Sequence, residues 1–150
     1  MRKLIIGLAL AAGCRTAAPM AGSGSQPPGN VTGATTEHAA IDQFMAAITA
    51  QDLQALGGIW GTKDGPAREQ MSGDQLQERE LIMFCYFKHN SYDIVSDAPS
   101  LNGDRTFAVL VKFGPISHTG QFQVTRAKDG RFYVVGVNNF PEFQDVCAAK

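Results

Sequence analysis

Three cysteines, at positions 14, 85 and 147, are the side chains of this sequence with the clearest chemistry. Cys14 follows a short apolar run and stands apart from the other two. Cys85 and Cys147 form an even pair, which predicts a disulfide if the chain is exported to an oxidising compartment. In the chain-entropy model, closing a loop of about 60 residues contributes about 4 kcal/mol to the free energy of unfolding. Two independent buried thiols are the alternative.

The histidines do not have the spacing of a metal site. His38, His89 and His118 are far apart, and the sequence has no CxxC pair and no glycine-rich phosphate loop after a strand. We therefore expect no metal and no cofactor. His118 falls on the apolar side of a predicted strand, where Asn139 would lie opposite it and Tyr133 would share its face. A histidine at a pocket rim can act as a general base, and a histidine that is hydrogen-bonded locally or wet is the alternative.

Trp60 is the only tryptophan of the sequence and ends a predicted helix. In that place it would either line a ligand cavity or pack in the core. Together with His118, Tyr133 and Asn139 it makes up the pocket residues that the sequence predicts. No residue is assigned a catalytic role.

The N-terminus has the pattern of an export signal. Two cations precede the apolar run at 4–12, LIIGLALAA, which is shorter than the roughly 20 residues of a bilayer-spanning helix. The sequence LAAGC at 10–14 resembles the lipobox of bacterial lipoproteins, which implies cleavage after residue 13 and a lipid on Cys14. Cleavage without lipid, after Ala11, is the alternative. The resemblance also implies anchoring in the cell envelope, with Arg15 favouring the outer membrane.

The chain divides into three parts. Residues 1–13 are the predicted signal peptide, and residues 14–36 are the lipidated cysteine and a tether rich in Gly, Ala, Pro and Thr. Such a tether spans roughly 25 Å as a flexible coil. Residues 37–150 are the predicted folded domain. Once the three cations before residue 16 are left out, ten Lys and Arg face fourteen Asp and Glu, which disfavours nucleic acid as a partner.

Three helices are predicted at the start of the domain. Thr36 caps the first, whose apolar stripe is Ile41, Phe44, Met45 and Ile48. Asp52 caps the second, which ends near Trp60, and 61–71 is expected to be a loop. The third begins at a capping-box pattern, Ser72 to Gln75, and runs to about Lys88. Its second half, 81–87, is apolar on every face, so we expect it to be deeply buried or else partly strand.

From Tyr92 the apolar period changes to two, which predicts about four strands: 92–96, 106–113, 117–125 and 131–137. Even-length hairpins pair Val111 with His118 and Phe107 with Phe122, and Phe122 with Val135. One face is then almost wholly apolar and includes Tyr133, Val135 and Val137. The other is polar except at Leu110, Phe132 and Val134. We therefore predict an α+β fold in which three N-terminal helices pack on one face of a curved antiparallel sheet.

This arrangement resembles the nuclear transport factor 2-like, cystatin-like α+β cone. The residues that carry the resemblance are the helix 41–48, the junction 51–53, Trp60 and the strands of 105–138. Many members place a hairpin between the second and third helices, where 61–71 shows no strand pattern. The family includes transport adaptors, isomerase-like and cyclase-like enzymes, and small secreted domains. The resemblance also implies a homodimer that forms through the outer face of the sheet.

We expect a membrane-anchored, exported lipoprotein that acts as a non-catalytic binding or interaction module of the cell envelope. Its partners would be the membrane, through the lipid, and either a protein or a small apolar ligand. The alternative is an isomerase-like or cyclase-like enzyme that acts on a small apolar substrate in the cone, with His118, Tyr133 and Asn139 as its polar groups.

Overall fold

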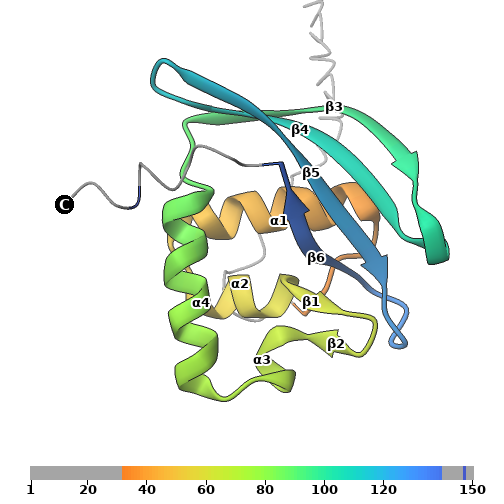
Figure 1. Cartoon of the computed structure of the whole chain (residues 1–150). Helices are drawn as coiled ribbons and strands as arrows, with labels where there is room; N and C mark the ends of the chain where they lie inside the picture. Colours follow the sequence, from red (N-terminus) through yellow and green to blue (C-terminus); the bar gives the residue numbers. More distant parts are fainter. Residues whose placement is uncertain (1–31, 140–146, 148–150) are drawn as a thin grey trace, which may run out of the picture.

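A computed structural model of the chain describes residues 32–139 and Cys147. The predicted signal peptide, Cys14, most of the tether and residues 140–146 lie outside the described residues. The elements are α1 Glu37–Ala50, α2 Leu53–Ile59, β1 Gly61–Thr62, β2 Gly65–Pro66, α3 Ala67–Gln70, α4 Gly73–Tyr86, β3 Ser91–Pro99, the short 3₁₀ helix η1 Leu101–Gly103, β4 Arg105–Phe113, β5 Ile116–Arg126 and β6 Phe132–Asn138. They are shown in Figure 1.

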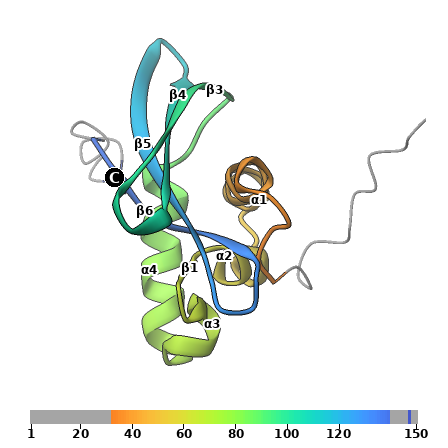
Figure 2. The ribbon, with the colours of Figure 1, turned by 90° about the vertical axis from the view of Figure 1, so that its right-hand side faces the viewer.

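The fold is α+β, as the sequence predicts, with a four-stranded antiparallel sheet in the order β3-β4-β5-β6. α1 packs against β5 and β6, and α4 runs crosswise to α1 (Figures 1 and 2). The core lies between α1 and the sheet, where the rings of Phe44 and Phe122 meet edge to face at 6.0 Å. Phe107 and Ile41 are buried in the same cluster.

Local signals explain where the first two helices begin and end. The side chain of Thr36 accepts a hydrogen bond from Ala39 N at 3.2 Å and begins α1. Gln51 ends α1 in the left-handed conformation, with φ 52°. Asp52 then accepts from Ala55 N at 3.0 Å and begins α2 at once. The sharp turn between these helices therefore follows from one capping residue at each side.

The predicted register of β4 and β5 is confirmed, and that of β5 and β6 is wrong along the whole pair, by one residue next to the turn and by two residues beyond it. Val111 pairs with His118 and Phe107 with Phe122. Phe122, however, pairs with Val137 instead of Val135. One residue of this shift comes from the turn, because Arg126 pairs with Phe132 across residues 127–131, a loop of odd and not even length. The other comes from one extra residue in β6, where the register shifts between Gln123 and Val124.

The bulge changes which β6 side chains face the core. Val134 pairs with Val124 and is fully buried, although the alternation placed it on the outer face. Val135, placed in the core by the sequence, is only half-buried. Val134 is therefore not one of the three apolar residues expected on the outer face, which leaves Leu110 and Phe132.

Residues 61–71, expected to be a loop, contain the β1–β2 hairpin and α3. Two-residue strands are too short to show a period of two, so the sequence pattern could not reveal them. Gly61 is required here because a Cβ at this position would overlap the carbonyl oxygen of Gly65. Gly65 itself has φ 126°, which favours glycine.

α4 is a helix as predicted, but it is not buried on every face. Leu81 is 54% exposed and Ile82 is 52% exposed, whereas Phe84 and Phe87 are buried. The helix packs through one side only, so its outer apolar residues stay accessible. Ser72 precedes α4 without the side-chain cap bond that the capping-box pattern predicted.

The packed unit begins before residue 37, the boundary drawn from composition. Ala34 is buried, and its backbone N–H and C=O each form a hydrogen bond of 2.9 Å with Phe132. Gly33 N donates to Gly58 O at 2.8 Å. These bonds add a short segment to the edge of β6, so residues 33–36 belong to the domain and not to the tether.

Candidate functional site

An apolar groove of about 300 Å³ lies between α4 and β6. α4 contributes Ile82, Met83 and Tyr86, and β6 contributes the run 134–137. The remaining lining residues are aromatic: Phe44 of α1, Trp60 at the end of α2 and Phe87 at the end of α4. The volume is at the lower end of the range for small-molecule sites, and such sites are mostly apolar.

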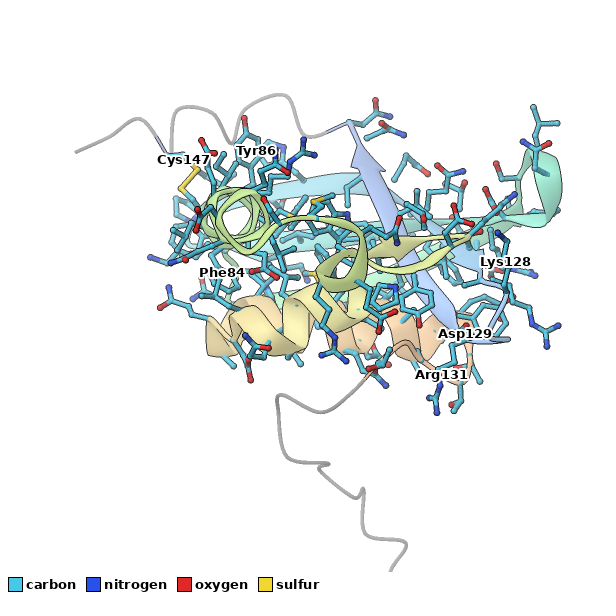
Figure 3. All side chains as sticks on the ribbon, turned by 90° about the horizontal axis from the view of Figure 1, so that it is seen from below. Phe84, Tyr86, Lys128, Asp129, Arg131 and Cys147 are labelled. Carbon is cyan, nitrogen blue, oxygen red and sulfur yellow. A yellow bond between two sulfur atoms is a disulfide. The ribbon has the colours of Figure 1, made fainter. Side chains whose placement is uncertain are left out.

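Two helical columns build the α4 wall of the groove. Ile82 and Tyr86 are four residues apart, as are Met83 and Phe87, so each pair lies on one face of the helix. Figure 3 looks along α4 and shows Tyr86 and Phe84 leaving the helix on opposite sides. The helix thus presents one side to the core and another to the groove.

Trp60 is held at the base of the groove by its backbone. Its N–H donates to Leu56 O at 2.9 Å, and its C=O accepts from Ala67 N at 2.8 Å. It also forms a parallel bridge with Val134 of β6. The predicted pocket role of Trp60 is therefore consistent with its position, since its side chain is half-buried and lines the groove.

Tyr133 does not join Trp60 in the groove. It lies at the start of β6, fully buried, and its hydroxyl donates to Asp129 Oδ2 at 2.6 Å. Burial first, and then the bond to Asp129, raise the pKa of the Tyr133 phenol. The same bond lowers the pKa of the Asp129 carboxyl. This pair fastens the turn between β5 and β6.

His118 and Asn139 are not brought together either. His118 is half-buried on β5, opposite Val111. Asn139 is exposed just beyond β6, with φ 62°. Because Gln121 pairs with Asn138, continuing the register brings Asn139 beside residue 120 and not beside His118. The odd-length turn at 127–131 and the bulge in β6 each contribute one residue to this shift of two.

Glu80 is a buried titratable residue that the sequence analysis missed. Its side chain is 2% exposed, and its Oε1 has no hydrogen-bond partner. Burial first, and then the charge of Asp52, raise the pKa of the Glu80 carboxyl to about 7. Its signal in the sequence is an acidic residue on the same helical stripe as Leu76, Met83 and Phe87.

A second polar cluster ties β3 to α1. The hydroxyl of Tyr92 donates to Asp42 Oδ1 at 2.7 Å. Burial first, and then the bond to Asp42, raise the pKa of the Tyr92 phenol. His89 follows α4, with Nε2 3.1 Å from the hydroxyl of Thr49 and Nδ1 2.8 Å from the carbonyl oxygen of Phe87. These polar groups hydrogen-bond with one another or with the backbone, so the packing of the elements is enough to account for the cluster.

The predicted disulfide between Cys85 and Cys147 is present, with the two Cα atoms 5.6 Å apart. Cys85 precedes Tyr86, so the bridge lies beside the groove wall (Figure 3). A second hollow of about 420 Å³ lies by Cys85, and its other lining residues are Gln51, Leu53, Leu81, Phe84 and Lys88.

Among residues 32–139 and 147, no cluster of three or more His, Cys, Asp or Glu could hold a metal ion. No helix in the same part of the chain is long and apolar enough to cross a membrane. Comparison of the chain with protein-family models, curated protein sequences and solved structures finds no match. The groove therefore has to be interpreted from its own geometry.

Proposed function

We propose that this protein is an exported, lipid-anchored lipoprotein whose domain is a non-catalytic binding module of the cell envelope. The groove between α4 and β6 takes a small apolar ligand, such as an acyl chain, or an apolar side chain of a protein partner. The observation that carries this proposal is the groove itself, an accessible hollow of about 300 Å³ with aromatic and aliphatic walls.

The order of elements supports the resemblance to the nuclear transport factor 2-like cone. A short hairpin, β1–β2, lies between α2 and α4, at the place where many members of that family have one. The helices precede a meander of four antiparallel strands. The disulfide fits an oxidising compartment outside the cytoplasm, which supports export and, with the lipobox pattern, anchoring through Cys14.

The chemistry of the walls favours binding over catalysis. Within residues 32–139 and 147, the lining side chains carry two groups able to donate a hydrogen bond, the indole N–H of Trp60 and the hydroxyl of Tyr86. An enzyme in this groove would need polar side chains that converge on a substrate. Tyr133 and Asn139, two of the groups considered for that role, lie away from the groove lining.

The unique Trp60 provides the test. The mature protein with Cys14→Ser is titrated with decanoate that carries bromine atoms, which quench indole fluorescence on contact. We expect saturable quenching, because Trp60 lines the groove. Ile82→Glu should weaken the binding severalfold, because it places a charge in an apolar wall.

Leu81→Glu is the matched control. Leu81 is the neighbouring residue and equally exposed, but it lines the other hollow. Binding that survives Leu81→Glu and is lost with Ile82→Glu supports the groove. The opposite result would move the site to the hollow lined by Lys88 and Leu81, and the absence of any quenching would contradict an apolar ligand of this class.

The anchor is tested separately. We expect the unsubstituted protein to incorporate labelled fatty acid and to fractionate with membranes, and Cys14→Ala to do neither. A protein that fractionates identically with and without Cys14 would show that no lipid is added there.

A further inference from the structure

Glu80 is buried at the contact between α4 and α2. Its Oε1 lies 2.7 Å from the position that a Cβ on Gly57 would occupy, so the bare glycine of α2 makes room for the carboxyl. Oε1 has no hydrogen-bond partner. No described cation forms an ion pair with Glu80. An ionised carboxylate is costly in such a place, whereas a neutral carboxyl is tolerated.

The charged groups on the neighbouring helices do not compensate Glu80. α2 contributes Asp52, whose negative charge opposes ionisation. α3 contributes Glu69, which has the same sign, and Arg68, whose guanidinium donates to Thr32 and to a carbonyl of α2. The core-facing side of α1 is apolar. Burial and Asp52 therefore act together, and the pKa of Glu80 rises to about 7.

Glu80 is also connected to the groove. It shares the inward side of α4 with Met83 and Phe87, three and seven residues further on, and both of these line the groove. Trp60, in the same lining, directly follows α2, the helix that Glu80 faces. Glu80 thus lies at a contact between two helices, α2 and α4, that each lead into the lining of the groove.

We infer that the proton on Glu80 holds α4 against α2, and that its loss loosens this contact and weakens binding in the groove. The second half of this inference rests on the function proposed above. The direction follows from linkage, because the pKa is higher in the folded protein, about 7, than its ordinary value of 4.5. The contribution of Glu80 to stability is present in full below the ordinary value and is lost as the pH rises through about 7.

The experiment uses the mature protein with Cys14→Ser, compared with the same protein carrying Glu80→Gln, which cannot ionise. Thermal midpoint and Trp60 quenching by brominated decanoate are both measured from about pH 5.5 to about pH 8.5. Without the Glu80 substitution, we expect the midpoint to fall by about 5 °C or more across this range, and the affinity severalfold. With Glu80→Gln, both dependences should be largely lost.

Two controls isolate Glu80 from other groups. Glu78→Gln changes an exposed glutamate of the same helix, so it should keep the pH dependence of the parent. Every variant retains His38, His89 and His118, so the difference between two profiles isolates the substituted glutamate.

Each outcome decides something different. If Glu80→Gln and its parent have the same pH dependence of the midpoint, the inference is wrong, whatever the groove binds. If decanoate binds at no pH, the proposed function fails while the midpoints still test Glu80. If Glu80→Gln does not fold, an NMR titration of the labelled glutamate carboxyls decides. A carboxyl that titrates near 7 supports the inference, and titration of all of them below about 5 overturns it.

Discussion

The two ends of β6 handle buried polar groups in opposite ways. At the start of the strand, the hydroxyl of Tyr133 donates to Asp129, which also accepts from Arg131 N at 2.8 Å. Towards the other end, β6 forms an apolar groove with α4, the helix that also carries Glu80, a buried carboxyl whose Oε1 has no partner. In Figure 3 the turn residues and Tyr86 lie at opposite ends of the molecule.

We take this difference to separate a structural end from the end that we propose to bind a ligand. A satisfied network fixes one conformation and leaves no group available for a ligand. An accessible hollow and an unpartnered buried group weaken the fold and are retained more readily where they serve a function. The two ends should also respond oppositely to pH, because the pKa of Asp129 is lowered whereas that of Glu80 is raised.

The largest predicted effect is the loss of the disulfide beside the groove. Reduction, or Cys85→Ala, should lower the free energy of unfolding by about 2–5 kcal/mol. Urea unfolding with and without reductant measures this. Cys14→Ala is the control and should give the same transition as the parent protein, both with reductant and without it. A transition that reductant does not move would mean that the bridge does not form.

Gly61→Ala should have the next largest effect. The added methyl group meets the backbone of Gly65 and Pro66, which cannot move without opening the β1–β2 hairpin. We expect a loss of about 1–3 kcal/mol by urea unfolding. Gly73→Ala is the matched control, since its Cβ meets nothing within 4 Å and should be neutral or stabilising. Equal stability of both variants would contradict the hairpin.

Tyr133→Phe should cost about 1 kcal/mol at neutral pH, since it removes the hydrogen bond to Asp129. The bond lowers the pKa of Asp129, so its contribution is present above the ordinary pKa and is lost as the pH falls through the lowered one. The difference from the parent should therefore shrink in acid. Tyr86→Phe, at the groove, should be nearly neutral. A Tyr133→Phe deficit that grows in acid would contradict this assignment.

The smallest effect is expected at Lys128. Its ammonium lies 2.6 Å from Asp64, but both side chains are largely exposed to water. Solvent screens such pairs, so Lys128→Ala should leave the urea midpoint unchanged within error. A clear loss of stability would show that the turn is held by charge and not by the Tyr133 bond.

The sequence predicts the β4–β5 hairpin well and the last strand poorly, for a physical reason. Phe107 and Phe122 stand in strands whose large core-facing residues recur every second position, so one register buries both. The last strand reads FYVVGV, where neighbouring residues are all apolar or glycine, and the position of a bulge leaves no trace in such a run. The predicted meeting of His118 with Asn139 failed for that reason and because the β5–β6 loop, residues 127–131, has an odd length.

The candidate site could be predicted only in part. Trp60 and Cys85 could be singled out in the sequence because tryptophan and cysteine are rare residue types. The predicted burial of α4 on every face was wrong, because Leu81 and Ile82 are residue types typical of a core and yet are exposed. Glu80 shows the reverse. Its burial depends on Gly57, 23 positions earlier, and no spacing in the sequence connects the two.

The central claim, that the groove between α4 and β6 binds apolar ligands, is tested most directly by locating the bromine atoms. Crystals grown with brominated decanoate would reveal them by anomalous scattering. The account predicts bromine between Ile82 of α4 and Val137 of β6, in contact with Trp60. Bromine in the hollow beside Leu81 and Lys88, or at no ordered position, would contradict it.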